Sequence, residues 1–414
     1  MLATAQFRDP LPLSNRVQRY DWGSVDAIPG FVGKEPDGGP QAELWLGAHT
    51  SAPSTVRLPD VNVSLDELVR SLPEDALGHR VAERFGPRLP YLLKVLAAGR
   101  ALSLQVHPSS SRARDGFERE NNEGVPFGPK RSFRDDQHKP EMLLALTQFE
   151  GLAGFRNPRT ILELLDGLSG TLVDGVRGIL MRDRSHAGMR AAFQLLLSGR
   201  LEPSCAADID ATLVVVRERL RAGSPFSRAD RTVADLADQH PGDPGAIASL
   251  MLNRISLEPG EAIFTPAGEV HAYLSGLGVE IMANSDNVLR AGLTSKHVDE
   301  AALMACASFV PRRPASPEVT TSGSRGQVHT YRVPVAEFAL TTADVDLSEA
   351  VTMPPAGPRI VLGLSGRVEL ATERSDGGRV TLQRGESAFV PHGAGGLQVA
   401  GSGYVLCAWV PDPG

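Results

Sequence analysis

Two stretches of this sequence follow the same pattern: Leu257-Glu-Pro-Gly-Glu-Ala-Ile-Phe-Thr-Pro-Ala-Gly268 and Leu382-Gln-Arg-Gly-Glu-Ser-Ala-Phe-Val-Pro-His-Gly393. Each contains a turn glycine, an acidic residue, a short strand-forming run, a proline and a second glycine. This succession of short strands and turns is typical of a double-stranded β-sandwich of the jelly-roll kind. The repeat therefore predicts a mainly β chain with two such sandwiches.

The two copies differ at one chemically important position. His271 follows the first copy, whereas the aligned position after the second copy is Gly396. Because glycine has no side chain to bind a metal, we expect a metal site only in the first sandwich. The second sandwich is expected to be a packing or lid-bearing domain.

Candidate partners for His271 occur in two further segments. In the segment 102–108, the alternation of a strand places Ser103, Gln105 and His107 on one face. In the segment 138–142, Lys139 and Glu141 share a face by the same rule.

The set Gln105, His107, Glu141 and His271 supplies two imidazoles, one carboxylate and one amide oxygen. These groups suit a borderline cation. Zinc is the preferred ion, although iron, manganese or cobalt can use the same ligands. Tyr273 lies two residues from His271 and shares its face.

Composition limits the classes of function. The chain has 414 residues, enough for two or three domains, and no segment of about 18 uninterrupted apolar residues that would predict a membrane helix. A formal charge of −7 argues against a nucleic-acid partner, but a small anion can bind where Lys139, Arg290 and Lys296 gather.

Cysteine usage and the N-terminus favour the cytoplasm. Cys205, Cys306 and Cys407 form no CxxC pair, and the residues from Met1 to Asp9 lack a basic segment followed by an apolar one. We therefore expect buried, unpaired thiols and no signal peptide.

The chain divides into four segments by pattern. Residues 1–156 alternate short strands and turns, with a polar excursion at 108–137 that we interpret as a long loop. Residues 157–250 carry helical periodicity, beginning with Asn157 as cap and Pro158 in the first turn. Strands return in 251–315 and continue in 316–414.

Helices within the second segment are expected from periodicity alone. The expected ranges are 189–197, 206–220, 227–236 and 246–252.

These motifs together resemble the type I mannose-6-phosphate isomerases (phosphomannose isomerases) of the cupin superfamily. The resemblance covers nearly the whole chain, and its most specific part is Asn284-Ser-Asp-Asn-Val-Leu-Arg-Ala-Gly-Leu-Thr-Ser-Lys296. The other matching blocks, in chain order, are 15–24, 42–54, 102–108, 139–141 and 271–273.

The resemblance implies two cupin domains, with a helical domain inserted in the first. It also implies one zinc ion per chain on Gln105, His107, Glu141 and His271. The reaction it implies interconverts D-mannose 6-phosphate and D-fructose 6-phosphate by moving a proton between C2 and C1 through a cis-enediol. The expected partner is a small sugar phosphate, and a monomer is expected.

The resemblance assigns roles around the metal but leaves the catalytic base open. Glu280, Lys139 and Asp286 are candidates in no fixed order. Arg290 is expected to stabilise developing negative charge or bind phosphate, and Lys296, Ser103 and Tyr273 to contact substrate.

Each of these residues also has a purely structural interpretation. Arg290 and Lys296 can be solvated surface charges, and Lys139 a salt-bridge partner. Ser103 can bond the backbone, and Tyr273 can be core packing.

Two other functions fit parts of the pattern. One is a cupin oxygenase with iron on two His and one carboxylate, against which Gln105 and the 284–296 block argue. The other is a sugar-phosphate-binding cupin without activity, against which the complete ligand set and Arg290 argue. Whether the enzyme would serve mannose catabolism or GDP-mannose supply is left open by the sequence.

Overall fold

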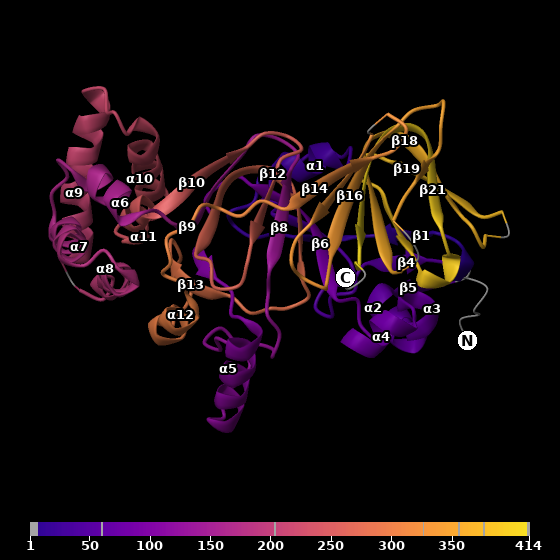
Figure 1. Cartoon of the computed structure of the whole chain (residues 1–414), viewed down its shortest axis with the longest axis horizontal. Coiled ribbons are helices and arrows are strands. Elements are labelled where there is room, and N and C mark those ends of the chain that lie inside the picture. Colours follow the sequence, from indigo (N-terminus) through magenta and orange to yellow (C-terminus); the bar gives the residue numbers. More distant parts are fainter. Residues whose placement is uncertain are drawn as a thin grey trace.

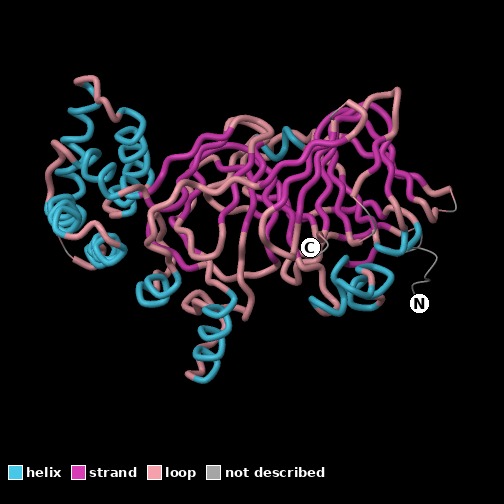
Figure 2. Tube along the Cα trace, viewed as in Figure 1, coloured by secondary structure: helices cyan, strands magenta, loops and turns pink. Residues whose placement is uncertain are grey.

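The computed structural model describes residues 7–411, apart from 59–60, 203, 326, 355–356 and 376. The expectation that the N-terminus lacks a signal peptide falls partly on residues 1–6, which lie outside the described residues. The fold is mainly antiparallel β, as the repeat predicted, and comprises a ten-stranded and an eleven-stranded sheet (Figure 2).

The ten-stranded sheet runs in the order β10-β9-β12-β6-β3-β2, with four further strands paired beside this path. Its strands are β2 (Arg16–Gln18), β3 (Glu43–Leu46), β6 (Tyr91–Ala98), β7 (Leu104–Val106), β8 (Glu141–Ala145), β9 (Phe149–Phe155), β10 (Leu252–Leu257), β11 (Ala262–Thr265), β12 (His271–Ala283) and β13 (Leu289–Gly292).

The eleven-stranded sheet contains all the strands from β14 onward together with three from the N-terminal region. Its strands are β1 (Leu11–Ser14), β4 (Thr55–Arg57), β5 (Asn62–Ser64), β14 (Glu318–Ser322), β15 (Val328–Arg332), β16 (Ala339–Val345), β17 (Val351–Thr352), β18 (Arg359–Thr372), β19 (Arg379–Gln383), β20 (Ser387–Val390) and β21 (Leu397–Trp409).

The beginning of the chain is divided between the two sheets. β1 pairs with β20, with Leu11 opposite Phe389, and on its other side with β4. β2 instead pairs with β3 in the ten-stranded sheet. One end of the chain therefore completes the sheet built by the other end.

The strand–turn pattern of the repeat is confirmed. Gly260 precedes β11 and Gly385 precedes β20, with φ angles of 90° and 83°. This left-handed backbone suits glycine because other residues meet a steric penalty there.

Six of the twelve α-helices in the described residues lie in one block between β9 and β10, at the opposite end of the molecule from β21 (Figure 1). The block contains α6 (Pro158–Leu165), α7 (Thr171–Arg182), α8 (His186–Gly199), α9 (Cys205–Arg221), α10 (Ser227–Gln239), α11 (Gly245–Ala248) and the short 3-10 helix Ser249–Met251.

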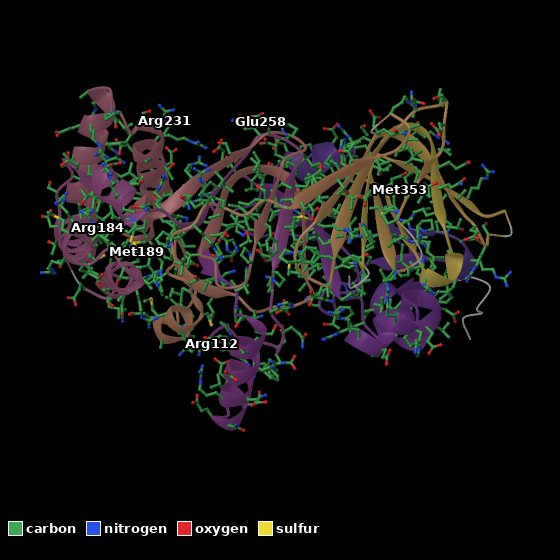
Figure 3. The ribbon with its side chains drawn as sticks, in the orientation of Figure 1. Arg112, Arg184, Met189, Arg231, Glu258 and Met353 are labelled. Atoms are coloured by element: carbon green, nitrogen blue, oxygen red, sulfur yellow. The ribbon has the colours of Figure 1, made fainter. Side chains whose placement is uncertain are left out.

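The start of the helical block is as predicted. The side chain of Asn157 accepts a hydrogen bond from the backbone N–H of Arg159 at 2.9 Å. The helix expected over 246–252 is shorter, because Leu252 already begins β10. The α7 helix was not predicted. Met189 is buried in the block, whereas Arg184 and Arg231 are exposed (Figure 3).

The remaining helices lie outside this block. They are α1 (Ala27–Phe31), α2 (Leu65–Ser71), α3 (Pro73–Leu77), α4 (His79–Phe85), α5 (Ser110–Asn122), α12 (Glu300–Cys306) and a second 3-10 turn, His392–Ala394. Within the described ranges, every helix is too short or too polar to span a bilayer.

The interpretation of 108–137 as a long loop was wrong in part. It contains α5, which projects away from the sheets (Figure 1). Ser109 caps it by accepting from the backbone N–H of Arg112, and Ala113, Gly116 and Glu120 form its buried side. Small and charged residues on that side hid the apolar periodicity on which the sequence interpretation depended.

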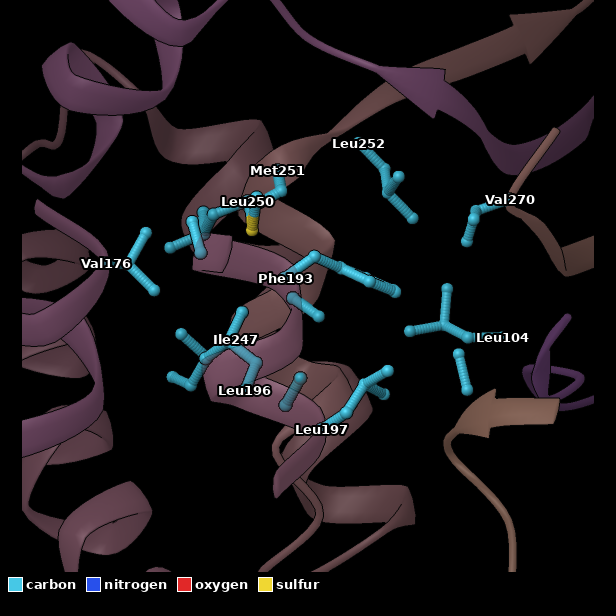
Figure 4. Close-up of a cluster of buried hydrophobic side chains, with 14 of the residues drawn as sticks. Leu104, Val176, Phe193, Leu196, Leu197, Ile247, Leu250, Met251, Leu252 and Val270 are labelled. Carbon is cyan, nitrogen blue, oxygen red and sulfur yellow. The ribbon is translucent and has the colours of Figure 1, made fainter. Parts of the chain in front are cut away.

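The helical block shares its hydrophobic core with a strand of the ten-stranded sheet. Leu104 of β7 and Val270 pack in the same cluster as Phe193 and Leu197 of α8 (Figure 4). Gln105 lies beside Leu104 on β7, so packing of the helical block fixes the strand that carries it.

Candidate metal centre and substrate pocket

The structure brings together His107, Glu141 and His271 from separate parts of the chain. Glu141 begins β8, His271 begins β12, and His107 directly follows β7. One potential ligand atom from each lies within 4.8 Å of the others, and all three side chains are buried. Strand pairing explains why these side chains lie close together, since both β7 and β8 pair with β12. Gln105 of β7 lies opposite His271, and Glu141 of β8 lies opposite Met282 of β12.

Backbone carbonyls orient both imidazoles. His107 donates Nδ1–H to Asn287 O at 2.6 Å, and His271 donates Nδ1–H to Glu269 O at 2.9 Å. A carbonyl can only accept, so each Nδ1 carries a proton, and the neutral form of each ring has its lone pair on Nε2, toward Glu141. The Nε2 atoms lie 3.1 and 3.2 Å from the Glu141 oxygens.

Two of these buried polar atoms have no hydrogen-bond partner among the described residues: His107 Nε2 and Glu141 Oε2. Burial lowers the pKa of His107 to about 4, which keeps the imidazole neutral near pH 7. Burial alone would raise the pKa of Glu141, but the adjacent His107 and Lys139 outweigh it and hold this pKa well below its usual range. A neutral imidazole and an ionised carboxylate with unused lone pairs fit a bound cation.

Gln105 completes the set. Its side-chain amide nitrogen lies 3.3 Å from His271 Nε2. A 180° rotation of the amide places the oxygen at that point instead, and an amide oxygen can bind a metal.

The metal centre opens into a cavity of about 510 Å³, within the range typical of small-molecule sites. His107 and His271 lie behind its wall. The predicted residues that line the cavity are Ser103, Gln105, Lys139, Glu141, Tyr273, Glu280, Asp286, Arg290 and Lys296. Trp22 and Trp45 also line it.

A buried charge network that sequence reasoning missed forms one wall. Lys94 Nζ lies 3.4 Å from Glu43 Oε1 and 3.2 Å from Glu280 Oε2. Burial opposes the charge on Lys94, but Glu43, Glu280 and Glu141 outweigh it and raise its pKa. The signal in the sequence was one lysine inside an apolar strand, Tyr91–Ala98, where an unpaired charge is too costly to bury.

Four cations on the pocket wall lack an acidic partner. Among the described residues, no carboxylate oxygen lies within 4.0 Å of Arg100, Arg134, Arg290 or Lys296. Burial, and then the charge of Arg134, lowers the pKa of Arg290. Like charges gathered without a counter-charge favour an anionic ligand.

The other predicted residues differ in environment. Tyr273 is buried, and burial followed by the charge of Glu280 raises its pKa well above the usual range. Burial and then Glu141 raise the pKa of Glu280. Asp286 is half exposed and lies 3.4 Å from His49 Nε2, a hydrogen bond that lowers its pKa. Lys139 lies 3.5 Å from Glu141.

The helical block also reaches the cavity, which its sequence did not indicate. Gln239 and His240, at the end of α10, line it. Gln239 Oε1 accepts from the backbone N–H of Ala101 at 2.8 Å, and Arg100 donates to Gln239 O at 3.1 Å. These bonds join the block to the segment leading into β7.

Fold and site together define a class: a mainly β protein with a buried two-histidine, one-carboxylate centre beside a cation-lined cavity. Residues 11–158 match the family model of the phosphomannose isomerase type I catalytic domain.

The chain is 35% identical to mannose-6-phosphate isomerase of Salmonella typhimurium, covering 94% of this chain and 97% of that one. It is 36% identical to mannose-6-phosphate isomerase of Escherichia coli with the same coverage. A zinc-bound crystal structure of mannose 6-phosphate isomerase matches 98% of this chain and all of that chain, with a TM-score of 0.87 and 32% identity. The chain belongs to the type I phosphomannose isomerase family.

Proposed function

We propose that this protein is a zinc-dependent isomerase that interconverts D-mannose 6-phosphate and D-fructose 6-phosphate. The observation that carries the proposal is the buried His107, Glu141 and His271 centre beside a cavity lined by four cations without acidic partners among the described residues. The names of the relatives support the same reaction.

One zinc ion per chain is held by Gln105, His107, Glu141 and His271. When bound, zinc stabilises the negative charge that develops on the substrate oxygens. Among the described residues, the one cluster of His, Cys, Asp or Glu side chains that could hold a metal is His107, Glu141 and His271, which supports the assignment of a single ion.

Arg290 and Lys296 bind the phosphate and orient the sugar toward the metal centre. Ser103 and Tyr273 contact the sugar. Lys139 lies on the same wall beside Glu141, where its charge stabilises an oxyanion.

Isomerisation requires a base that moves a proton from C2 to C1 through a cis-enediol. Among the three candidates, Glu280 is favoured because its pKa is raised by burial and by Glu141. Asp286 is a weaker base, since His49 lowers its pKa. Lys139 is paired to a carboxylate and serves better as a cation.

The architecture proposed is two cupin domains, with a helical domain inserted in the first. The catalytic cupin comprises 1–156 and 251–315, the helical domain 157–250, and the C-terminal cupin 316–414. A cytoplasmic monomer is proposed, and the three unpaired thiols support the reducing compartment.

The decisive experiment is a coupled assay for fructose 6-phosphate formed from mannose 6-phosphate, with elemental analysis of the same preparation. Turnover with one zinc per chain is expected. No turnover with bound sugar phosphate would favour a binding protein, and iron with substrate-dependent oxygen consumption would favour an oxygenase. About two firmly bound ions per chain would contradict the single site.

A further inference from the structure

Asn287 lies between the metal centre and the cationic wall. It is in the loop between β12 and β13, and its side chain is fully buried. Its backbone carbonyl accepts the Nδ1–H of His107 at 2.6 Å. This bond decides which nitrogen of His107 carries the proton and leaves Nε2 for a metal.

The Asn287 side chain holds a different segment. Its Oδ1 accepts from the backbone N–H groups of Arg134 at 2.7 Å and Asp135 at 3.3 Å. Its Nδ2 donates to the backbone oxygens of Asp135 at 2.8 Å and Gln137 at 2.9 Å, and to Asp135 Oδ1 at 3.1 Å. An amide is required, because the site needs an acceptor and a donor on one side chain.

Asp135 closes the connection from the opposite side. Its carboxylate accepts from Ser285 Oγ at 2.8 Å, from the Asp286 backbone N–H at 2.7 Å and from the Gln137 backbone N–H at 2.9 Å. Residues 134–137 lead directly to Lys139 and Glu141. The loop that orients His107 and the segment that leads to Glu141 are therefore one hydrogen-bonded unit.

We propose that Asn287 is a positioning residue, whose side chain sets the spacing of His107 and Glu141 across the metal centre. Metal–ligand distances tolerate deviations of only about 0.2 Å, so a loose segment 134–137 weakens binding even with all ligands present. The same unit directs Arg134, through its backbone N–H, to the pocket wall. The inference rests on the metal-dependent function proposed above.

The test compares Asn287→Ala with Asn15→Ala in the full chain. Asn15 is a matched control, since it links Ser54 Oγ and Ser387 Oγ at 2.8 Å each and does not line the cavity. Zinc affinity is measured by competition with a chromophoric chelator, and thermal unfolding is followed on the metal-free proteins. Asn287→Ala is expected to bind zinc about 10- to 100-fold more weakly, the scale for lost partners of metal ligands. Asn15→Ala should bind within about twofold of the parent.

Asp135→Asn keeps the shape of the unit but removes one carboxylate oxygen, and it serves if Asn287→Ala does not fold. Its zinc affinity should fall between those of the parent and Asn287→Ala. Zinc affinity within twofold of the parent in the folded variants would overturn the proposal, as would an equal loss in Asn15→Ala. Because this test measures zinc affinity, a failure of the Asn287 proposal can be distinguished from a failure of the proposed function, which would appear as a lack of isomerase activity in the parent.

Discussion

The two strand–turn repeats share a backbone pattern but not an interior. After the first repeat, β12 begins with His271 and its neighbourhood buries Lys94, Glu141 and Glu280. After the second repeat, β21 begins with Leu397, and the packed cluster around it is apolar.

The difference teaches how function is added to a stable β framework. Burying charges costs free energy that only pairing or a bound ion offsets, whereas apolar strands stabilise their fold directly. The C-terminal cluster, built from apolar side chains such as Val361 and Val405, stabilises its strands directly. The ten-stranded sheet keeps a set of charges that a ligand or metal must complete.

The largest effect is expected from removing the first repeat's histidine. His271→Ala should abolish isomerase activity in metal-free buffer, because the three remaining ligands hold the ion poorly. The protein should stay folded, since apolar strands form the core. His392→Ala, in the second repeat, should keep its metal and activity. Steady-state kinetics and elemental analysis on both variants check this, and near-parental turnover of His271→Ala would show that the ligand assignment is wrong.

The next effect concerns the cations that line the cavity beside the first region's metal centre. Arg290→Ala should lower kcat/KM on mannose 6-phosphate roughly a hundredfold, about 3 kcal/mol, as expected for one charged stabilising group. Arg290→Lys should recover only part, because an ammonium cannot reproduce the planar fork. Metal content should not change. Unaltered kinetics would return Arg290 to a surface-charge role, and lost metal would mean a structural effect.

A smaller effect compares one buried cation from each region. Lys94→Met should lower the free energy of unfolding by about 3 kcal/mol, because Glu43 and Glu280 are left buried without a counter-charge. Arg359 bonds only carbonyl oxygens, among them Gly395 O at 2.7 Å. Arg359→Met should therefore cost less and leave turnover unchanged. Urea unfolding of both variants measures the two losses in unfolding free energy. A larger loss in Arg359→Met than in Lys94→Met would contradict this prediction.

The smallest difference between the two regions is expected in the reactivity of their cysteine thiols, which should be low in both. Burial raises the pKa of Cys306 to about 11 and that of Cys407 to about 12. At pH 8 the thiolate fraction is then about 0.001 or less, so both should alkylate slowly until the protein unfolds. Peptide mapping after iodoacetamide treatment measures this, and fast labelling of Cys407 in the native protein would refute it.

His107, Glu141 and His271 fall in short motifs that the sequence singled out, and the structure brings these three side chains together. The sequence also predicted the strand–turn repeat and the start of the helical block. It could not predict that Lys94 pairs with Glu43 and Glu280, because these residues lie on three strands that only the sheet brings together.

The sequence also contained no sign that residues from irregular segments line the cavity. Arg134 stands in a polar excursion, and His240 ends a helix that lacks any motif. Backbone hydrogen bonds hold both segments: Asn287 Oδ1 accepts from the Arg134 N–H, and Gln239 Oε1, next to His240, accepts from the Ala101 N–H. Such bonds leave no periodic pattern in the sequence.

The pairing of Leu11 with Phe389 has a consequence for synthesis of the chain. β1 is among the first segments to leave the ribosome, but its partner β20 is among the last. Pairing two strands so far apart in the sequence has a high entropic cost and is slow. Until β20 has been synthesised, the edge of β1 that pairs with it stays unpaired. Truncation shortly before residue 387 should therefore release the N-terminal strand as well and leave an aggregation-prone edge at both ends of the chain.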